Sequence, residues 1–354
     1  MLARNGKDTG TSPVENLKDF YYALPKVELH RHLEGSLRLR TMQEIARAQG
    51  ITVPTNTGSL SNLVQVQRSE PSTYQNFLAK FSTLRLLYRS PEVIHRVTRE
   101  AVEDAAKDNV RYLELRFTPV ALSRAERFPL GDVLDWVCES ALKAGREFGL
   151  RVGLIVSVNR HETVELAEQV AWLAVSRLGR GLVGLDLAGN EAEFPAGPFA
   201  GIFREAQQSG LKLTIHAGEW GGAANVREAL EIFNADRIGH GVRVLEDPST
   251  VALARERGAA FEVCVTSNYQ TGVIPASTEH PLMKMLKEGI NITLGADDPS
   301  ISQITLTDEY QHVCEDMDMS RPKLKERILA AAKAAFMPDQ ERQNLVDQLR
   351  LELI

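Results

Sequence analysis

Eight short apolar runs constrain the fold of this chain more than any other feature. Helical patterns separate them, and five of them end in polar residues that could bind a metal or transfer protons. Most runs are rich in β-branched residues and almost continuously apolar, as is typical of parallel strands covered on both faces. They span Lys26–His32, Val110–Phe117, Arg151–Val158, Leu182–Leu187, Leu211–His216, Arg237–His240, Ala259–Val265 and Asn291–Leu294. Strands that alternate with helices predict an α/β fold, here a (β/α)8 barrel, which gathers the carboxyl ends of its strands into one pocket.

Helical patterns fill the segments between these runs. Apolar residues recur at helical spacing in Asp132–Glu147, Glu162–Arg177, Phe199–Ser209, Asn225–Ile232, Thr250–Arg257 and Pro281–Glu288. The tail after Thr307 also has a helical pattern, and we expect it to pack outside the barrel or at a subunit interface. The sequence therefore leaves the oligomeric state open.

A long insertion between the first two strands, residues 36–109, breaks this rhythm. We expect helices near Thr41–Gln49, at Tyr74–Leu87 and after Pro91, with Ser90 as the N-cap of the last. The middle of the insertion, Thr52–Ser72, is polar and turn-rich. A segment inserted after the first strand lies over the mouth of the pocket, so we interpret it as a lid or a specificity segment.

Composition narrows the class of protein. A length of 354 residues suits a single barrel domain over residues 16–354 after a disordered N-terminus of residues 1–15. With a formal net charge of −6 and no basic stripe, nucleic acid is not an expected partner. Three scattered cysteines match no zinc or redox pattern and suit a reducing cytoplasm. No apolar run predicts a signal peptide or a membrane span.

The strongest chemical signal is a pair of histidines at the end of the first strand. His30 and His32 alternate, so both imidazoles point to one face. A lone histidine there would more often be a hydrogen-bonded core residue. Two of them, with His216 and Asp297 at later strand ends, are better explained as metal ligands, because burying them without partners is costly. Three imidazoles and one carboxylate suit Zn²⁺, with Fe²⁺, Co²⁺ or Mn²⁺ less favoured.

Two further residues are placed to move protons. Glu219 follows His216 after Gly218, which lets the backbone turn sharply. Alone, Glu219 would be an acid that stabilises the first turn of a helix, but beside a ligand histidine a general acid with a raised pKa is the better interpretation. His240 lies between two glycines, which favours close approach of a ligand over a purely structural role.

Asp297 and Asp298 are adjacent at the end of the eighth strand. Two neighbouring carboxylates repel each other unless a cation or a proton intervenes, and a metal on Asp297 would remove that conflict. The alternative role for Asp298 is an Asx turn before Pro299.

Together these motifs resemble the adenosine deaminase family of the amidohydrolase superfamily. The resemblance runs from about Leu24 to about Asp308. It rests on the segments KVELHRHLEGS (26–36), DLAGNE (186–191), HAGE (216–219), RIGHG (237–241), TSN (266–268) and DDP (297–299). It implies a hydrolase that converts a 6-aminopurine nucleoside, adenosine or deoxyadenosine, to inosine or deoxyinosine and ammonia.

The resemblance also implies a role for each matching residue. Glu219 resembles the acid that protonates purine N1, and His240 the base that orients and deprotonates the attacking water. Substrate contacts are implied for Asp298 at N7, for the backbone of Gly189 at N3, and for Glu34 at the ribose. One Zn²⁺ per subunit is implied, with the ligands His30, His32, His216 and Asp297.

Glu34 departs from the family pattern, in which aspartate is common at this position. The glutamate resembles adenine deaminases and aminodeoxyfutalosine deaminases as much. The alternative is therefore a deaminase of adenine or of another 6-aminopurine derivative such as aminodeoxyfutalosine. A catalytically silent, purine-binding member of the family is a third interpretation, against which the intact Glu219, His240 and ligand set argue.

Overall fold

The strands of this protein form one sheet that curls into a near-closed barrel. The computed structural model describes residues 17–354, so the expectation of disorder for residues 1–15 lies outside the described residues. The strands are β1 (Lys26–His32), β2 (Val110–Phe117), β3 (Arg151–Asn159), β4 (Leu182–Ala188), β5 (Lys212–Ala217), β6 (Arg237–His240), β7 (Ala260–Val263) and β8 (Asn291–Leu294). They pair in parallel and in chain order from β1 to β8, which confirms the predicted (β/α)8 barrel.

The seam between β8 and β1 is closed by Asp297, which lies shortly after the end of β8. The Asp297 amide donates to the His30 carbonyl at 3.0 Å, and the His32 amide donates to the Asp297 carbonyl at 2.8 Å. Arg31 and Asp297 thereby form a parallel bridge. Two expected metal ligands of β1 and one from beyond β8 are thus held together by backbone hydrogen bonds.

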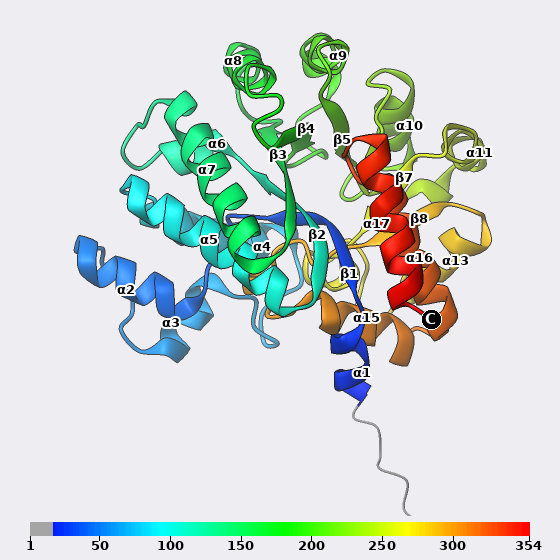
Figure 1. Ribbon diagram of the computed structural model, residues 1–354, viewed down its shortest axis with the longest axis horizontal. Coiled ribbons are helices and arrows are strands. Elements are labelled where there is room, and N and C mark those ends of the chain that lie inside the picture. Colours follow the sequence, from blue (N-terminus) through cyan, green and yellow to red (C-terminus); the bar gives the residue numbers. More distant parts are fainter. Residues whose placement is uncertain (1–16) are drawn as a thin grey trace, which may run out of the picture.

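Helices surround the strands (Figure 1). Those between successive strands are α7 (Leu130–Phe148), α8 (Val164–Val175), α9 (Ala200–Gln208), α10 (Ala223–Glu231), α11 (Pro248–Arg257) and α13 (Leu282–Lys287). The shorter α6 (Pro119–Ser123), η2 (Gly197–Phe199), η3 (Val244–Glu246), α12 (Val265–Gln270) and α14 (Pro299–Ser302) lie in strand-to-helix connections. The chain begins its described part with α1 (Leu17–Ala23) and ends with α15 (Leu306–Glu315), α16 (Arg321–Ala334) and α17 (Asp339–Glu352).

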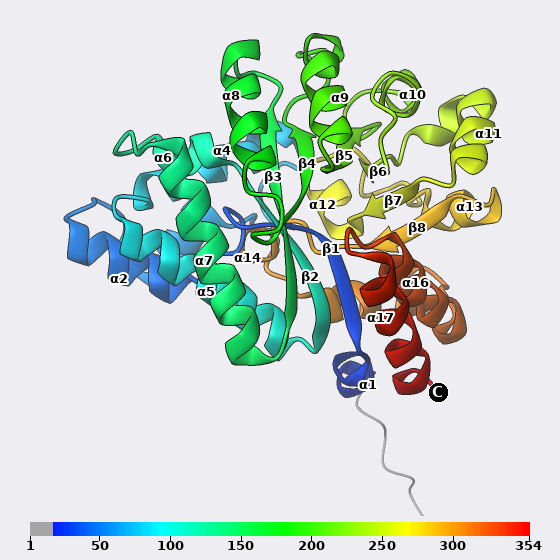
Figure 2. The same cartoon turned by 45° about the horizontal axis from the view of Figure 1, so that its top comes forward.

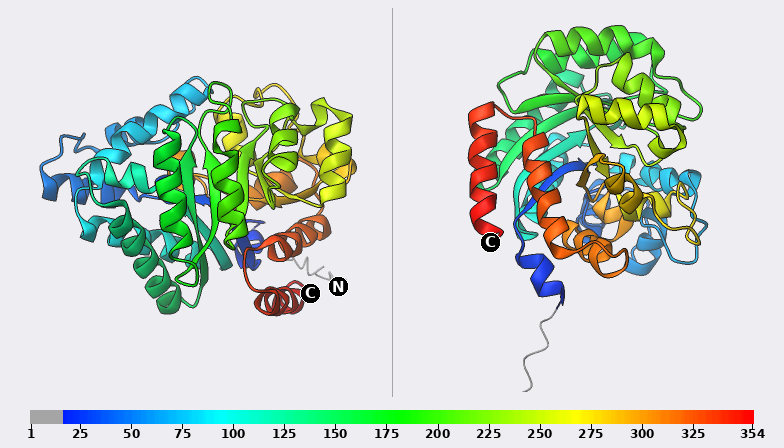
Figure 3. Two further views of the ribbon diagram at one scale, coloured as in Figure 1. Left: turned by 90° about the horizontal axis from the view of Figure 1, so that it is seen from above. Right: turned by 90° about the vertical axis from the view of Figure 1, so that its right-hand side faces the viewer.

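The helical tail packs on the outside of the barrel, which is one of the two arrangements expected from the sequence. Helix α16 contacts β8 and β1, and α17 lies beside α16 (Figures 2 and 3). The tail therefore covers the seam from outside.

The insertion after β1 consists of α2 (Leu39–Gln49), α3 (Thr57–Val64), α4 (Tyr74–Leu84), η1 (Arg85–Leu87) and α5 (Pro91–Lys107). Helices α2 and α3 project from one side of the barrel (Figure 1). The Ser90 side chain accepts the Val93 amide at the start of α5, which confirms the predicted cap.

One local prediction was incomplete and another was wrong. The polar, turn-rich segment Thr52–Ser72 also contains the helix α3, which is capped by Asn56 and buries Leu60 and Val64. The seventh strand ends at Val263, whereas we expected it to continue to Val265. Val265 instead opens α12, because the Glu309 carboxylate accepts the amide of the next residue at 3.0 Å and ends the extended chain there.

No helix among residues 17–354 has both the length and the apolar character needed to cross a membrane.

Candidate active site

A pocket at the carboxyl ends of the strands contains nearly every residue that the sequence singled out. Its lining includes the expected residues His32, Glu34, Gly189, His216, Glu219, His240, Asp297 and Asp298. His30 lies beneath them, fully buried. The barrel thus brings all nine expected residues to one place.

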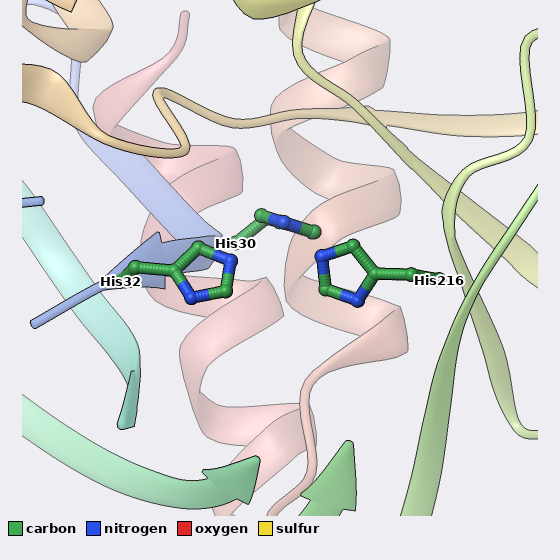
Figure 4. Close-up of side chains that lie close together, drawn as sticks. All are labelled: His30, His32 and His216. Carbon is green, nitrogen blue, oxygen red and sulfur yellow. The ribbon is translucent and has the colours of Figure 1, made fainter. Parts of the chain in front are cut away.

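Three imidazoles converge at the floor of this pocket. His30, His32 and His216 point toward one another (Figure 4), and one ring nitrogen of each lies within 4.8 Å of the other two. The Nε2 atoms of His30 and His32 both lie 3.3 Å from Asp297 Oδ1. Cys264 Sγ is also close to His30 and Asp297, but burial raises the pKa of its thiol well above the usual value, which disfavours the thiolate that a metal needs.

Two buried carboxylates orient these rings. Glu262 lies 2.8 Å from His30 Nδ1, and Asp186 lies 2.9 Å from His216 Nδ1. A neutral imidazole that donates from Nδ1 presents the lone pair of Nε2, so both rings aim an acceptor at the centre of the cluster. His30 Nε2 is buried and makes no hydrogen bond to any residue of the described chain. A divalent cation at this point would complete its coordination, so the donor set fits a metal.

Sequence reasoning missed the orienting role of Glu262 and Asp186. Each is an acid inside an otherwise apolar strand, β7 or β4, and that break in the pattern was the available signal. Glu262 also accepts from Arg116 at 2.7 Å and from Arg237 at 2.5 Å. Although burial favours the neutral acid, these two guanidinium groups hold the pKa of Glu262 well below its usual value.

The turn that carries Glu219 is held by a residue to which the sequence analysis gave no role. The Glu191 carboxylate accepts the backbone amides of Gly218 at 3.0 Å, Glu219 at 2.6 Å and Trp220 at 2.7 Å. Gly218 has φ of +70°, which a side chain rarely adopts. The Glu219 side chain is thereby directed into the pocket, with Oε2 3.6 Å from His240 Nε2.

Three carboxyl groups at this site favour the protonated form. Burial and then the charge of Asp297 raise the pKa of Glu219 well above its usual value. The same causes, with Glu34 and Glu219 added, raise the pKa of Asp298. Burial also raises the pKa of Glu34, although its Oε1 accepts the Thr118 amide at 2.7 Å. The pocket therefore offers O–H donors as well as acceptors.

Two of these carboxyls keep a free oxygen for a ligand. Asp298 Oδ1 and Glu34 Oε2 are buried and find no hydrogen-bond partner within residues 17–354. The neighbouring Gly35 is packed so tightly that a Cβ there would lie 1.8 Å from Asp298 Oδ1. Glycine at this position is therefore required for the observed placement of Asp298.

Two of the site residues have a strained backbone. His240 and Asp297 both adopt left-handed backbone conformations, with φ of 58° and 59°. Such conformations are uncommon for residues with a side chain and persist where the surroundings enforce them. Here they turn both side chains into the pocket at the point where β6 and β8 end.

The insertion supplies one wall of the pocket. Phe77 and Phe81 of α4 and Arg85 of η1 line it. Tyr74, the first residue of α4, stacks on Trp220 with a centroid distance of 5.0 Å and an interplanar angle of 28°. Trp220 directly follows Glu219, so this stack joins the insertion to the turn that carries the expected acid. The arrangement supports the interpretation of the insertion as a lid.

Comparison with known proteins gives a consistent match. The model of the family described as adenosine deaminase matches residues 25–351. The chain is 34% identical over 331 residues to the adenosine deaminase of Clostridium perfringens (strain SM101), covering 94% of this chain and 98% of the relative.

Solved structures are similar over the same extent. An adenine deaminase from Arthrobacter aurescens has a TM-score of 0.85 at 25% identity and covers 93% of this chain and 98% of its own. A zinc-bound amidohydrolase from Burkholderia ambifaria also has a TM-score of 0.85 at 25% identity, with coverage of 98% and 97%. An Arabidopsis protein named ADAL, solved with the purine nucleotide IMP, has a TM-score of 0.83 at 26% identity, with coverage of 95% and 100%.

Proposed function

The chain belongs to the adenosine deaminase family of the amidohydrolase superfamily and is an adenosine deaminase-type hydrolase; on that premise, we propose that it deaminates adenosine and deoxyadenosine with one Zn²⁺ per subunit. We also propose that residues 16–354 act as a single deaminase domain. The observation that carries the proposal is the convergence of His30, His32, His216 and Asp297 beneath a pocket that also presents Glu219 and Asp298.

The metal ligands in this proposal are the four residues at the floor of the pocket. His30 Nε2 makes no hydrogen bond within residues 17–354, and this atom and the carboxylates behind His30 and His216 support the assignment. A divalent cation held there supplies a Lewis acid that makes water a nucleophile at neutral pH.

The purine is recognised by donors on the wall of the pocket. Ring nitrogens N1 and N7 of a 6-aminopurine accept hydrogen bonds, so they require O–H or N–H groups opposite them. Glu219 is assigned to N1 and Asp298 to N7, since the raised pKa of each carboxyl keeps a proton available. The backbone of Gly189, which lines the pocket and has φ of +94°, is assigned to N3.

Catalysis then depends on one proton from Glu219. Attack of water at C6 disrupts the aromatic ring, and protonation of N1 lets the ring accept the displaced electron pair. The new C–O bond forms at C6 and the C6–N6 bond breaks. One proton of the water leaves with N6 as ammonia, and the other restores Glu219, whose own proton stays on N1 of the product. His240 orients the water, and the tautomer of its ring decides whether it can also accept a proton.

Glu34 favours one alternative substrate strongly enough to test. Its free Oε2 is buried at the pocket wall, where a ribose hydroxyl would satisfy it. Glutamate reaches one methylene further into the pocket than the aspartate common in the family. A ligand with a smaller group at this wall, as in adenine, is therefore the second candidate, and aminodeoxyfutalosine is a third.

A spectroscopic assay separates these substrates. Purified, zinc-loaded protein is incubated in turn with adenosine, deoxyadenosine, adenine, AMP and aminodeoxyfutalosine, and the ultraviolet shift from aminopurine to oxopurine is followed. The proposal expects the highest kcat/KM for adenosine or deoxyadenosine. A higher value for adenine or aminodeoxyfutalosine would transfer the assignment to that substrate, and no shift with any of them would support the silent, purine-binding interpretation.

A further inference from the structure

A buried chain of hydrogen bonds connects the start of α13 to His240. His280, Asn268 and His240 are each at most 1% exposed. His280 Nε2 lies 3.2 Å from Asn268 Oδ1, and Asn268 Nδ2 lies 3.2 Å from His240 Nδ1. His280 is not part of the pocket lining. The connection gives it a path to the catalytic centre.

The direction in which these hydrogen bonds are donated is fixed at the His280 end. The backbone amide of Leu282 points at His280 Nδ1 at 3.1 Å. A backbone N–H can only donate, so His280 Nδ1 must hold a lone pair and the ring must carry its proton on Nε2. Pro281 has no N–H, which leaves Leu282 as the first amide that can fill this role.

The same direction of donation continues from His280 through Asn268 to His240. The protonated Nε2 of His280 donates to the side chain of Asn268, so the oxygen of that amide faces His280. The NH₂ of Asn268 therefore faces His240 and donates to its Nδ1. A ring that accepts at Nδ1 carries its proton on Nε2.

The pocket side of His240 agrees with this assignment independently. Its Nε2 faces Glu219 Oε2 at 3.6 Å and Asp297 Oδ2 at 3.9 Å. The carboxylate of Asp297 attracts an N–H and would repel a lone pair, whereas a protonated Glu219 is compatible with either tautomer. The hydrogen bonds behind the ring and Asp297 in front of it therefore select the same tautomer.

We propose that Asn268 and His280 are positioning residues that hold His240 as the Nε2–H tautomer, so that His240 donates a hydrogen bond to the oxygen of the attacking water and does not take its proton. The proposal rests on the deaminase function given above. The first proton lost by water passes instead to Glu219, which has just given its own proton to N1, and Glu219 delivers it to N6, which departs as ammonia. The second water proton, left on the C6 hydroxyl, passes to Glu219 as the C6 carbonyl forms, so Glu219 regains its proton. No other reactant is required.

The tautomer can be observed directly by NMR. In protein labelled with ¹⁵N at histidine, protonated and unprotonated ring nitrogens resonate far apart, and His240 is identified by its loss in His240→Asn. We expect His240 Nε2 to be protonated and Nδ1 unprotonated, in the metal-free and in the zinc-loaded protein. Asn268→Asp provides the reference for the opposite state, because a carboxylate only accepts and requires a proton on Nδ1.

A matched pair at position 280 tests the consequence for catalysis. His280→Leu removes the donor to Asn268, which frees that amide to rotate and present its oxygen to His240 Nδ1. His280→Gln retains an amide donor. We expect His280→Leu to lower kcat by about 10- to 100-fold, as for other outer partners of catalytic groups, with little change in KM. His280→Gln should remain near the wild-type value, and the zinc content of both variants should be unchanged.

The outcomes separate this inference from the proposed function. An unprotonated Nε2 on His240 in the wild type would overturn the inference, and so would unchanged or faster turnover in His280→Leu. If none of the 6-aminopurines is turned over, the proposed function fails, but the NMR measurement still decides the tautomer. A loss of kcat that His280→Gln fails to restore would show a structural role only and would also overturn the inference.

Discussion

At the scale of single residues, Glu219 is the group on which the proposed chemistry depends most. Replacing it with glutamine keeps the size and a hydrogen-bond donor but removes the transferable proton. We expect Glu219→Gln to bind zinc normally and to lose about 10²- to 10⁴-fold in kcat. Metal analysis and steady-state kinetics check this. Glu231→Gln on the exposed surface of α10 is the matched control and should be unaffected; a similar loss there, or near-normal kcat in Glu219→Gln, would refute the assignment.

Gly35 gives a purely steric test of Asp298. A Cβ at position 35 would lie 1.8 Å from Asp298 Oδ1, so Gly35→Ala must displace that carboxyl. Because small misplacements at an active site are costly, we expect kcat/KM to fall by about 100-fold. Gly201→Ala is the control, since no atom lies within 4 Å of its added Cβ and alanine suits the helix α9. Equal kinetics for the two variants would show that Asp298 does not contact substrate.

His280 should make stability depend on pH. Burial lowers its pKa from the usual value near 6.5 to about 3. Below pH 6.5 the unfolded chain therefore binds a proton that the folded protein excludes, so this contribution to stability is present at pH 7 and is lost as the pH falls. From pH 7 to pH 5, the unfolding free energy of the wild type should decrease by about 2 kcal/mol more than that of His280→Gln. The measurement is urea unfolding at the two pH values. Equal decreases in the unfolding free energy of the wild type and of His280→Gln would contradict this.

The sequence predicted the groups that face the pocket better than the groups that hold them. Topology alone brings together the residues at or just beyond the strand ends, which are His30, His32, His216, Glu219, His240 and Asp297. Glu262, Asp186 and Asn268 act through the direction of their hydrogen bonds. Those directions depend on which histidine ring nitrogen each of these side chains contacts. Only the three-dimensional packing determines that.

At the scale of secondary-structure elements, α4 is joined to the active site by the stack of Tyr74 on Trp220. An aromatic pair of this kind contributes about 0.5–1.5 kcal/mol. If the insertion closes the pocket over bound purine, Tyr74→Ala should raise KM by about 2- to 10-fold with a smaller effect on kcat. Trp172→Ala, at an aromatic residue that is 72% exposed on α8, is the control. An unchanged KM in Tyr74→Ala would show that the stack of Tyr74 on Trp220 plays no part in closing the pocket.

Strands were predicted more accurately than the insertion for a physical reason. β1, β2, β6 and β8 have the bounds expected from their apolar runs, because burial on both faces leaves a clear pattern. Helix α3 buries only Leu60 and Val64, and its cap at Asn56 has the composition of a turn. The end of β7 was not predictable locally, because it depends on Glu309 from a distant helix.

At the scale of the whole molecule, the barrel buries charged groups as well as aliphatic ones. Arg237 is 1% exposed, pairs with Glu262 and with Glu114, and lies over the ring of Phe336. Arg237→Met keeps much of the volume but leaves two buried carboxylates without this partner. We expect it to lower the free energy of unfolding by about 3–5 kcal/mol.

The control for Arg237→Met is Arg40→Met on α2, whose side chain is 89% exposed and pairs with Glu44. An exposed pair of this kind contributes at most about 1 kcal/mol. Urea unfolding of both variants should separate them clearly. Similar losses would show that the buried ion pairs contribute no more than surface ones.

The seam between β1 and β8 also bears on the order of biosynthesis. His30 and His32 leave the ribosome early, whereas Asp297, which joins their backbone, follows only after seven more strands have been made. A nascent chain that stops short of Asp297 would offer the proposed cation an incomplete set of donors and would hold the first strand only on its β2 side. Tight retention of zinc would then be a property of finished molecules alone, and it would distinguish them from truncated products in the same cell.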